Sequence, residues 1–402
     1  MINDPKQVSE IFNDAFINAA TLIGLEANCP QGQDHPSVIE ITKNVKCPVN
    51  KFKFEEVDEK TVMKYIKSID VKKATGIDNL SPKLLHLVSN EIVKPVTQNI
   101  NAMIRTGKFP EQLKIARVSP IFKKGDPLDK KNYRPVSILP ALSKVFERTI
   151  CTQLDNYFSN IFHPYLSAFR RGYSCQSTLI SLTEEWRTAL DNGKYAAAIL
   201  MDLSKAFDCV PADLLLEKLK AYGMDDSATK LMKCYLTNRK QCVKIDENLS
   251  EFKSVIKGVP QGSILGPTIF NIYLNDIFYF TKDTKLFNYA DDNTLSFAHD
   301  DINSLKSTLE NECNVLINWF SSNKMQANPD KFQALAVGKN TANQNVCFKI
   351  GDVELKADTD DVKLLGVKFD SNLNFDLHVK NICLKASRQA NALERISKHL
   401  SL

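Results

Sequence analysis

The chain has 402 residues, of which 43% are hydrophobic and 25% charged, and its formal net charge is +5. This length allows two or three packing units, and this composition is typical of a folded protein with a hydrophobic core, which excludes a mainly disordered chain. No apolar run approaches the ~18 residues that a transmembrane helix needs, and residues 1–6 lack the basic and apolar segments of a secretory signal. We therefore expect no membrane partner.

Predicted elements begin with an N-terminal helix at about 5–24, followed by a linker at 28–50 that is rich in Pro, Gly, Asn and Asp. Apolar periodicity and helix-start signals then predict further helices at about 58–70, 81–105, 141–158, 175–191, 211–222, 226–237, 266–279, 302–321 and 376–398. Between them the sequence predicts extended segments at 115–122, 195–201, 285–289 and 294–297, a hairpin near 241–256 and short strands up to about 370. This irregular alternation favours an α+β fold with an antiparallel sheet.

Ten cysteines are scattered along the chain, and no two of them form a CxxC pair. This spacing excludes a zinc knuckle and favours free, packed thiols in the reducing interior of a cell. The sequence does not distinguish nuclear from cytoplasmic residence.

Acidic residues end two of the predicted strands. Asp202 follows the apolar run 195–201, and Asp291 and Asp292 lie between the segments 285–289 and 294–297. If the two strands are neighbours, Asp202 and Asp291 meet at one end of a sheet. Converging carboxylates are the ligands that a pair of Mg²⁺ ions needs in phosphoryl or nucleotidyl transfer, although an acidic cluster can also be purely structural.

Three further Asp-Asp pairs have plainer interpretations. The pairs at 225–226 and 300–301 precede helical patterns and are expected to be N-caps, and the pair at 360–361 lies in a polar connection. Positive charge is also uneven, because residues 112–150 hold nine basic and three acidic side chains. Such an excess favours contact with a polyanion, the alternative being a solvated basic surface.

Six motifs follow one another along the chain: KKATGID at 72–78, SPIFKKGDPLDKKNYRPVSIL at 119–139, MDLSKAFD at 201–208, GVPQGSILGP at 258–267, YADD at 289–292 and VKLLGVKF at 362–369. Their order resembles the reverse transcriptase domain of non-LTR (LINE-type, jockey-like) retrotransposons. The segment from residue 11 to residue 16 also resembles the linker that precedes this domain in such elements. The resemblance covers about residues 55–400 and implies a right-hand polymerase with fingers, an antiparallel palm and the start of a helical thumb.

Within this resemblance, Asp202, Asp291 and Asp292 match the metal-binding triad, and the carbonyl of Leu203 is a further ligand. Two Mg²⁺ ions are implied, with Mn²⁺ as an alternative. Lys331 resembles the lysine that protonates the pyrophosphate leaving group; the alternative is a solvated surface lysine.

The resemblance also implies residues that bind the nucleotide and the primer. Lys123 or Lys124, together with Arg134, resembles the residues that clamp the triphosphate. Phe207 matches the steric gate that excludes a ribose 2′-OH, the alternative being a core aromatic. Gln261 and Gly262 match the loop under the incoming nucleotide, Leu365 and Gly366 match the hairpin that grips the primer end, and Asp208 is expected to cap the next helix.

These features predict three segments: residues 1–50 as an N-terminal helix and linker, 51–370 as fingers and palm, and 371–402 as the start of a truncated thumb. The implied function is RNA-directed DNA synthesis, in which dNTP substrates extend a DNA primer on an RNA template. Two alternatives remain open: an RNA-synthesising polymerase on the same palm, and a catalytically weak or inactive nucleic-acid-binding remnant. No endonuclease segment or C-terminal zinc knuckle accompanies the motifs.

Overall fold

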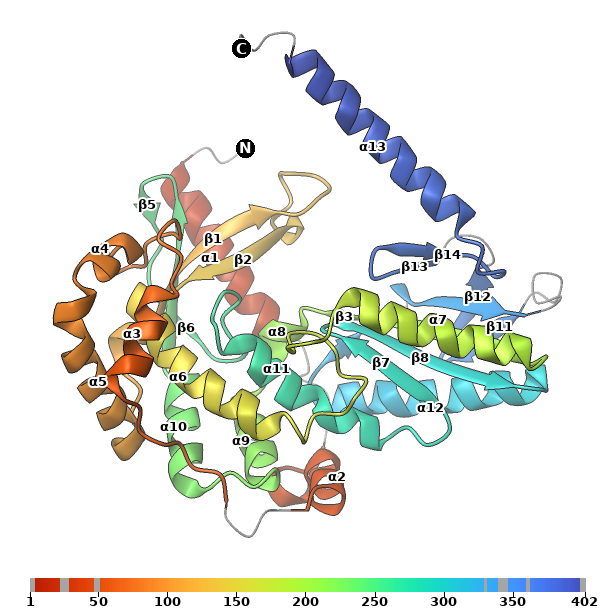
Figure 1. Ribbon diagram of the computed structural model, residues 1–402, viewed down its shortest axis with the longest axis horizontal. Coiled ribbons are helices and arrows are strands. Elements are labelled where there is room, and N and C mark those ends of the chain that lie inside the picture. Colours follow the sequence, from red (N-terminus) through yellow and green to blue (C-terminus); the bar gives the residue numbers. More distant parts are fainter. Residues whose placement is uncertain are drawn as a thin grey trace. The chain divides into compact units, whose positions relative to one another are not determined.

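The computed structural model describes residues 4–21, 29–46, 51–328, 331–338, 346–358 and 362–397. The chain divides into two compact units, and Figure 1 shows the path of the chain through their helices and strands. The first unit comprises Met1–His163, Ser204–Tyr279 and Trp319–Gln326, and the second comprises Pro164–Leu203, Phe280–Asn318 and Ala327–Leu402.

Helices predominate in the first unit. Its α-helices are α1 (Pro5–Thr21), α2 (Pro36–Asn44), α3 (Glu59–Lys67), α4 (Pro82–Leu87), α5 (Ser89–Thr106), α6 (Ala141–Phe158), α8 (Ala206–Cys209), α9 (Ala212–Ala221), α10 (Asp226–Leu236) and α11 (Gly266–Leu274). Its 3-10 helices are η1 (Gly32–Asp34), η2 (Glu111–Lys114), η3 (Lys130–Asn132) and η4 (Asn275–Tyr279), and its strands are β1 (Ile115–Phe122), β2 (Tyr133–Ile138), β4 (Arg239–Ile245), β5 (Asn248–Leu249) and β6 (Lys253–Val255).

Strands predominate in the second unit. Its strands are β3 (Tyr195–Ser204), β7 (Lys285–Tyr289), β8 (Asp292–His299), β10 (Gln333–Val337), β11 (Cys347–Ile350), β12 (Val353–Asp358), β13 (Val362–Leu364) and β14 (Val367–Phe369), and the short β9 (Gln326–Ala327) begins at its boundary. Its helices are α7 (Cys175–Asp191), α12 (Ile302–Ser322), whose last turn belongs to the first unit, and α13 (Asp376–Ser397).

The sheet of the first unit has the order β2-β1-β4-β5, and β6 also pairs with β4. Strand β1 is antiparallel to β2 and parallel to β4. Its inward side chains Ala116 and Val118 are buried and pack with Val243 of β4. Two partly buried aromatic residues of α1, Phe12 and Phe16, cover this core.

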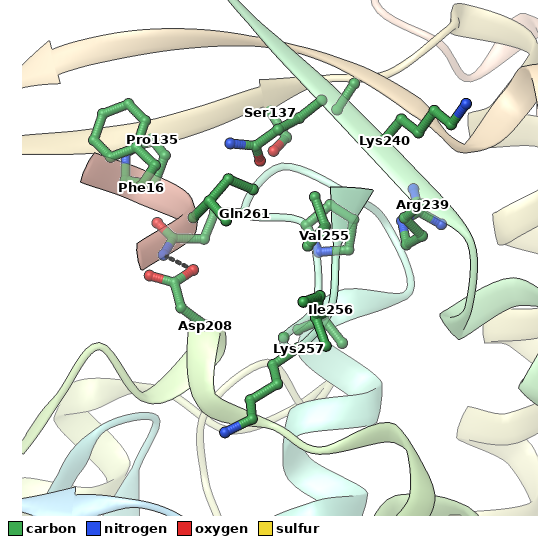
Figure 2. Close-up of a pocket in the computed structure, with 16 residues that line it drawn as sticks. Phe16, Pro135, Ser137, Asp208, Arg239, Lys240, Val255, Ile256, Lys257 and Gln261 are labelled. Atoms are coloured by element: carbon green, nitrogen blue, oxygen red, sulfur yellow. Dashed lines mark hydrogen bonds between the residues drawn. The ribbon is translucent and has the colours of Figure 1, made fainter. Parts of the chain in front are cut away.

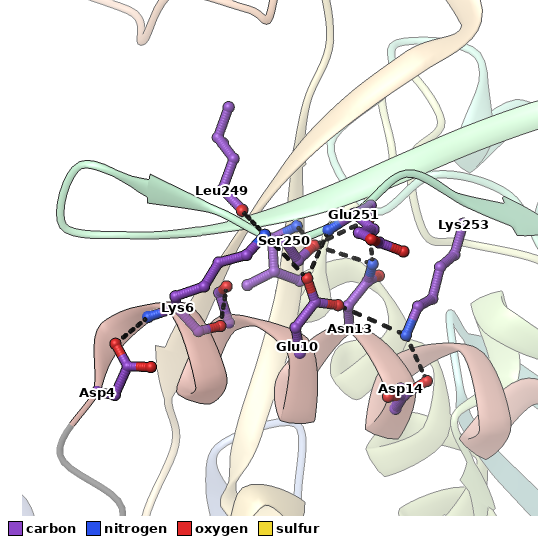
Figure 3. Close-up of polar contacts among 11 residues, drawn as sticks. Asp4, Lys6, Glu10, Asn13, Asp14, Leu249, Ser250, Glu251 and Lys253 are labelled. Carbon is purple, nitrogen blue, oxygen red and sulfur yellow. Dashed lines mark hydrogen bonds and ion pairs between the residues drawn. The ribbon is translucent and has the colours of Figure 1, made fainter.

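Helix α1 also makes a polar contact with the chain that joins β5 to β6, as Figure 3 shows. Asn13 is fully buried and donates from Nδ2 to Ser250 Oγ (3.0 Å) and to the Glu251 carbonyl (2.8 Å), while its Oδ1 accepts from Gln241 (3.1 Å). Lys253 pairs with Asp14 at 2.6 Å. The N-terminal helix is therefore part of the first unit and not an appendage to it.

The predicted linker at 28–50 is wrong for part of its length, because α2 lies within it. His35 caps this helix by accepting from the backbone amide of Ser37 at 3.1 Å, and Pro36 occupies the first turn. The helix is only nine residues long, and the burial of Val38 and Ile41 stabilises it. Such a short helix depends on tertiary packing, which composition does not reveal. Residues 22–28 and 47–50 lie outside the described residues.

The sheet of the second unit has the strand order β11-β12-β10-β3-β8-β7. Along this order the neighbouring strands are antiparallel except β10 and β12, which are parallel, and β9 also pairs with β3. The central strand β3 is the predicted apolar run, and Ala196, Ala197, Ala198 and Ile199 are at most 1% exposed. Leu182 and Trp186 of α7 pack on one face of this sheet, and Figure 1 shows the strands lying between α7 and α12.

Most predicted elements are confirmed, and α6, α7 and β1 have the predicted bounds. The helix predicted at 81–105 is instead two helices, because the backbone of Val88 (φ −96°, ψ 14°) leaves the helical region between α4 and α5. Asp225 and Asp301 cap α10 and α12 as predicted, accepting from the amides of Ala228 and Ser304 at 2.7 Å each. The pair 360–361 includes residues outside the described ranges.

The mixed fold with mainly antiparallel sheets is the predicted α+β class. Across the described ranges, nine cysteines are all free thiols, and no helix has the length and apolar character needed to span a membrane.

Candidate active site

The acidic residues of the second unit meet where β3 and β8 run side by side. In this antiparallel pair Asp202 lies directly opposite Asp292, and Met201 lies opposite Asn293. Asp291 is the second residue of the two-residue turn between β7 and β8, and Asp292 is the first residue of β8. The two strands are therefore neighbours, the condition on which the predicted meeting of Asp202 and Asp291 depended, and the residue directly opposite Asp202 is Asp292.

These carboxylates repel one another in the absence of a cation. Partial desolvation, followed by the charges of Asp291 and Asp202, raises the pKa of Asp292 to about 6. The residue is nevertheless exposed to solvent, which screens part of this repulsion. Lys331 supplies a compensating charge, since its Nζ lies 3.0 Å from Asp202 Oδ2. Residues 329 and 330 of the motif before it lie outside the described ranges.

A hollow of about 400 Å³ opens beside these side chains in the second unit. Asp202, Asp292 and Lys331 line one part of it, and Lys363 and Leu365 line another. The carboxylates and the tip of the β13–β14 hairpin therefore face one space.

The β13–β14 hairpin ends in a tight turn. Leu364 pairs with Val367, and the two residues between them have positive φ angles, 46° for Leu365 and 89° for Gly366. Two residues with positive φ form the turn whose twist suits a two-residue hairpin. A Cβ at Gly366 would meet no atom within 4 Å, so the outer side of the turn is open.

The donor set fits a hard divalent cation, because carboxylate oxygens and main-chain carbonyls such as that of Leu203 are the ligands that Mg²⁺ prefers. Across the described ranges, no group of three or more His, Cys, Asp or Glu side chains could hold a metal ion by itself. Mg²⁺ usually keeps several waters and binds through one or two carboxylates plus substrate phosphates. Asp202 and Asp292 match that pattern better than they match a closed cage.

The basic residues predicted to clamp a triphosphate lie on a hairpin of the first unit. Lys123 and Lys124 follow β1, and Arg134 lies on β2 opposite Ile121. All three are exposed. The Lys123 amide donates to the Asn132 carbonyl at 2.8 Å and so extends the hairpin beyond its strands.

Gln261 lies in a small cavity of about 50 Å³ in the first unit, which Figure 2 shows. Its Nε2 donates to Asp208 Oδ1 at 2.8 Å. Burial raises the pKa of Asp208, although this hydrogen bond opposes the shift. The prediction that Asp208 caps the next helix is wrong, because it lies inside α8, and Pro211 precedes α9 without a side-chain cap.

Two other predicted residues of the first unit have well-defined neighbours. Phe207 is half-buried and stacks on Phe270 with ring centroids 4.2 Å apart. Gly262 has φ 128°, and a Cβ there would collide with the Ser137 carbonyl. The close approach that this glycine permits is thus to the backbone of β2.

The sequence did not indicate two buried asparagines beside the acidic turn, Asn288 on β7 and Asn293 on β8, which lie opposite each other. Asn is depleted in strands. Two asparagines in strand-like segments on either side of an acidic pair were therefore the feature of the sequence that could have indicated them.

Comparison with known proteins gives the class of this chain. Residues 121–369 match the family described as "Reverse transcriptase (RNA-dependent DNA polymerase)". The chain belongs to this family, which confirms the resemblance inferred from the motifs.

Three of the proteins to which the chain is similar come from mobile elements of Drosophila melanogaster. The chain is 28% identical over 381 residues to the "Probable RNA-directed DNA polymerase from transposon BS", covering 88% of this chain and 40% of the relative. It is 26% identical over 368 residues to the "RNA-directed DNA polymerase from mobile element jockey", with 89% and 39% covered. It is 30% identical over 328 residues to the "Probable RNA-directed DNA polymerase from transposon X-element", with 77% and 35% covered. The chain thus spans about two fifths of the length of these relatives.

Proposed function

We propose that this chain is an RNA-directed DNA polymerase of a non-LTR retrotransposon, which transfers nucleotides from dNTPs to the 3′-OH of a primer on an RNA template. The observation that carries the proposal is the register of β3 and β8, which sets Asp202 opposite Asp292 beside a hollow of about 400 Å³. Membership of the reverse transcriptase family and the names of its relatives support dNTPs as the substrate and RNA as the template.

In this proposal Asp202, Asp291, Asp292 and the carbonyl of Leu203 hold two divalent cations, Mg²⁺ or Mn²⁺. Bound there, the cations would lower the pKa of the attacking hydroxyl and neutralise the charge of the triphosphate. Lys331 keeps an ammonium next to Asp202, where it can donate a proton to the leaving pyrophosphate. Leu365 and Gly366 present an open turn to the primer backbone.

The first unit would supply the nucleotide contacts. Lys123, Lys124 and Arg134 would bind phosphate oxygens, and Arg suits bidentate recognition of phosphate. Phe207 would contact the sugar face where a 2′-OH would lie, and the loop of Gln261 and Gly262 would lie under the base pair.

We assign the parts of the polymerase accordingly. The β1–β2 hairpin belongs to the fingers, the sheet of the second unit is the palm, and α13 is the start of the thumb. This follows the segments predicted from the sequence, 51–370 for fingers and palm and 371–402 for the thumb.

The decisive experiment is primer extension on poly(rA)/oligo(dT) with dTTP and Mg²⁺. We expect Asp291→Asn to reduce extension at least ~10³-fold, because it removes one of the charges that hold the cations, while circular dichroism shows an unchanged fold. Asp300→Asn changes an exposed member of another Asp-Asp pair in the same unit and should extend at the wild-type rate. Extension by Asp291→Asn at that rate would disprove the assignment.

The same assay separates the alternatives. A strong preference for dTTP over UTP supports DNA synthesis, and a preference for UTP would favour an RNA-synthesising polymerase instead. A wild-type chain that binds the duplex but incorporates neither nucleotide would be the nucleic-acid-binding remnant.

A further inference from the structure

The turn that carries Asp291 is strained. It joins β7 to β8 through two residues, Ala290 and Asp291, between the paired residues Tyr289 and Asp292. Ala290 has φ 57°, a conformation that a side chain with a Cβ disfavours and that glycine usually supplies in hairpins. Contacts from outside the turn must therefore stabilise it.

Two buried asparagines make those contacts. Asn288 donates from Nδ2 to the Ala290 carbonyl at 2.8 Å and to Asn293 Oδ1 at 2.9 Å. Asn293 donates from Nδ2 to the Asp291 carbonyl at 3.2 Å. Both carbonyls of the two-residue turn are thus tied to side chains that are at most 1% exposed.

Asn288 is itself fixed by the main chain. Its amide donates to the Tyr165 carbonyl at 3.0 Å, and its carbonyl accepts from the amide of Ser167 at 3.0 Å. In the part of the chain that the structure describes, Asn288 Oδ1 is a buried oxygen without a hydrogen-bond partner. An apolar residue would avoid that cost, so a buried asparagine here is not explained by packing alone.

We propose that Asn288 and Asn293 are positioning residues, which hold the carboxylates of Asp291 and Asp292 in the arrangement that a divalent cation requires. The inference rests on the proposed function of this site. Mg²⁺ demands near-ideal octahedral geometry, and groups that orient the ligands commonly change metal affinity 10- to 100-fold when they are removed. Without the two side chains, mutual repulsion of the carboxylates and the strain at Ala290 would both open the turn.

The test compares Asn293→Ala and Asn293→Ser with Asn314→Ala in the full chain. Asn314 is a matched control in the same unit, because its side chain also takes part in two hydrogen bonds. It donates to the Glu310 carbonyl (2.9 Å) and accepts from the amide of Gly351 (3.1 Å). The first readout needs no activity: a titration with MnCl₂, followed by electron paramagnetic resonance, gives the dissociation constant of the cation. The second readout is kcat and KM for dTTP in primer extension.

We expect both Asn293 variants to bind Mn²⁺ at least ~10-fold more weakly and to lose kcat with a smaller change in KM. Asn314→Ala should lower the melting temperature but leave the Mn²⁺ affinity unchanged. Wild-type Mn²⁺ affinity in Asn293→Ala would overturn the inference, and if that variant does not fold, Asn293→Ser decides on the same criterion.

Failure of the proposed function gives a different pattern. A wild-type chain that binds Mn²⁺ in an Asn293-dependent way but extends no primer supports the positioning role and refutes the polymerase. A wild-type chain that extends primers while Asn293 variants bind and extend equally well refutes only the positioning role. A wild-type chain without Mn²⁺ binding refutes both.

Discussion

Asp292 illustrates how the environment of one residue changes its pKa. Its neighbours raise its pKa to about 6 from an ordinary value of 3.8, through desolvation and then through the charges of Asp291 and Asp202. Because the folded-state pKa lies above the unfolded value, this carboxyl stabilises the folded chain only where it is protonated. That contribution is complete below about pH 4 and is lost as the pH rises through about 6.

Asp292→Asn should therefore stabilise the cation-free protein at neutral pH, because the amide keeps the shape of the side chain without its charge. We expect its melting temperature to exceed that of the wild type at pH 7.5, and this difference to shrink towards pH 4.5. Differential scanning fluorimetry in EDTA measures both. A difference that does not vary with pH would show that repulsion between the carboxylates does not contribute.

Helix α1 shows how a sequence can give an element without giving its place in the fold. Its periodicity gave the helix, and the composition of residues 28–50 predicted that a linker follows it. In the structure it covers the core of the β1–β4 sheet with Phe12 and Phe16, and its Asn13 makes three side-chain hydrogen bonds to the β4–β6 region. Phe12 also packs edge-on against Tyr133 of β2, with centroids 4.8 Å apart.

Asn13→Ala should therefore destabilise the first unit. It removes the acceptor of the buried Gln241 Nε2, whereas Ser250 Oγ keeps its hydrogen bonds with the Val243 amide and the Glu251 carbonyl. One unsatisfied buried group costs about 1–3 kcal/mol, so we expect a loss of about 1–3 kcal/mol in the free energy of unfolding. Urea denaturation followed by circular dichroism measures this loss. The control Asp14→Asn alters an exposed ion pair with Lys253 and should cost less than about 1 kcal/mol; an equal effect of the two would exclude a special role for Asn13.

For the whole molecule, the distribution of charge matters more than the total. The net charge of +5 is small for 402 residues, yet Lys123, Lys124 and Arg134 are gathered on one exposed hairpin. Binding to nucleic acid through such residues releases counterions, so the affinity falls steeply as salt is added. In a plot of log affinity against log salt concentration, each phosphate contacted makes the slope steeper by about 0.7–0.9.

Replacing Lys123, Lys124 and Arg134 together by Ala should weaken binding to an RNA–DNA duplex and reduce that slope by about 2–3. Fluorescence anisotropy at several KCl concentrations measures the slope. The control replaces Lys60, Lys64 and Lys67, three exposed lysines of α3, and changes the net charge equally. Equal slopes for the two triple variants would show that net charge, and not the hairpin, governs binding.

The amino-acid sequence by itself determined most of the helices and strands and indicated which acidic residues could form a site. Apolar periods gave α6, α7 and β1 with their observed bounds, because local periodicity and capping signals suffice for long, regular elements. It also indicated that Asp202 and Asp291 meet if their strands are neighbours, since an acid at the end of a buried strand is costly without a partner, and the resemblance added Asp292 to them.

Only the tertiary structure decided which groups surround those acids. The register of β3 with β8 set Asp202 opposite Asp292, and the hydrogen bonds of Asn288 and Asn293 fixed the turn between them. Likewise α2 exists because Val38 and Ile41 are buried, and Asp208 pairs with Gln261 although it was expected to cap a helix. These outcomes depend on contacts between residues far apart in the chain, and such contacts leave no periodic trace in the sequence.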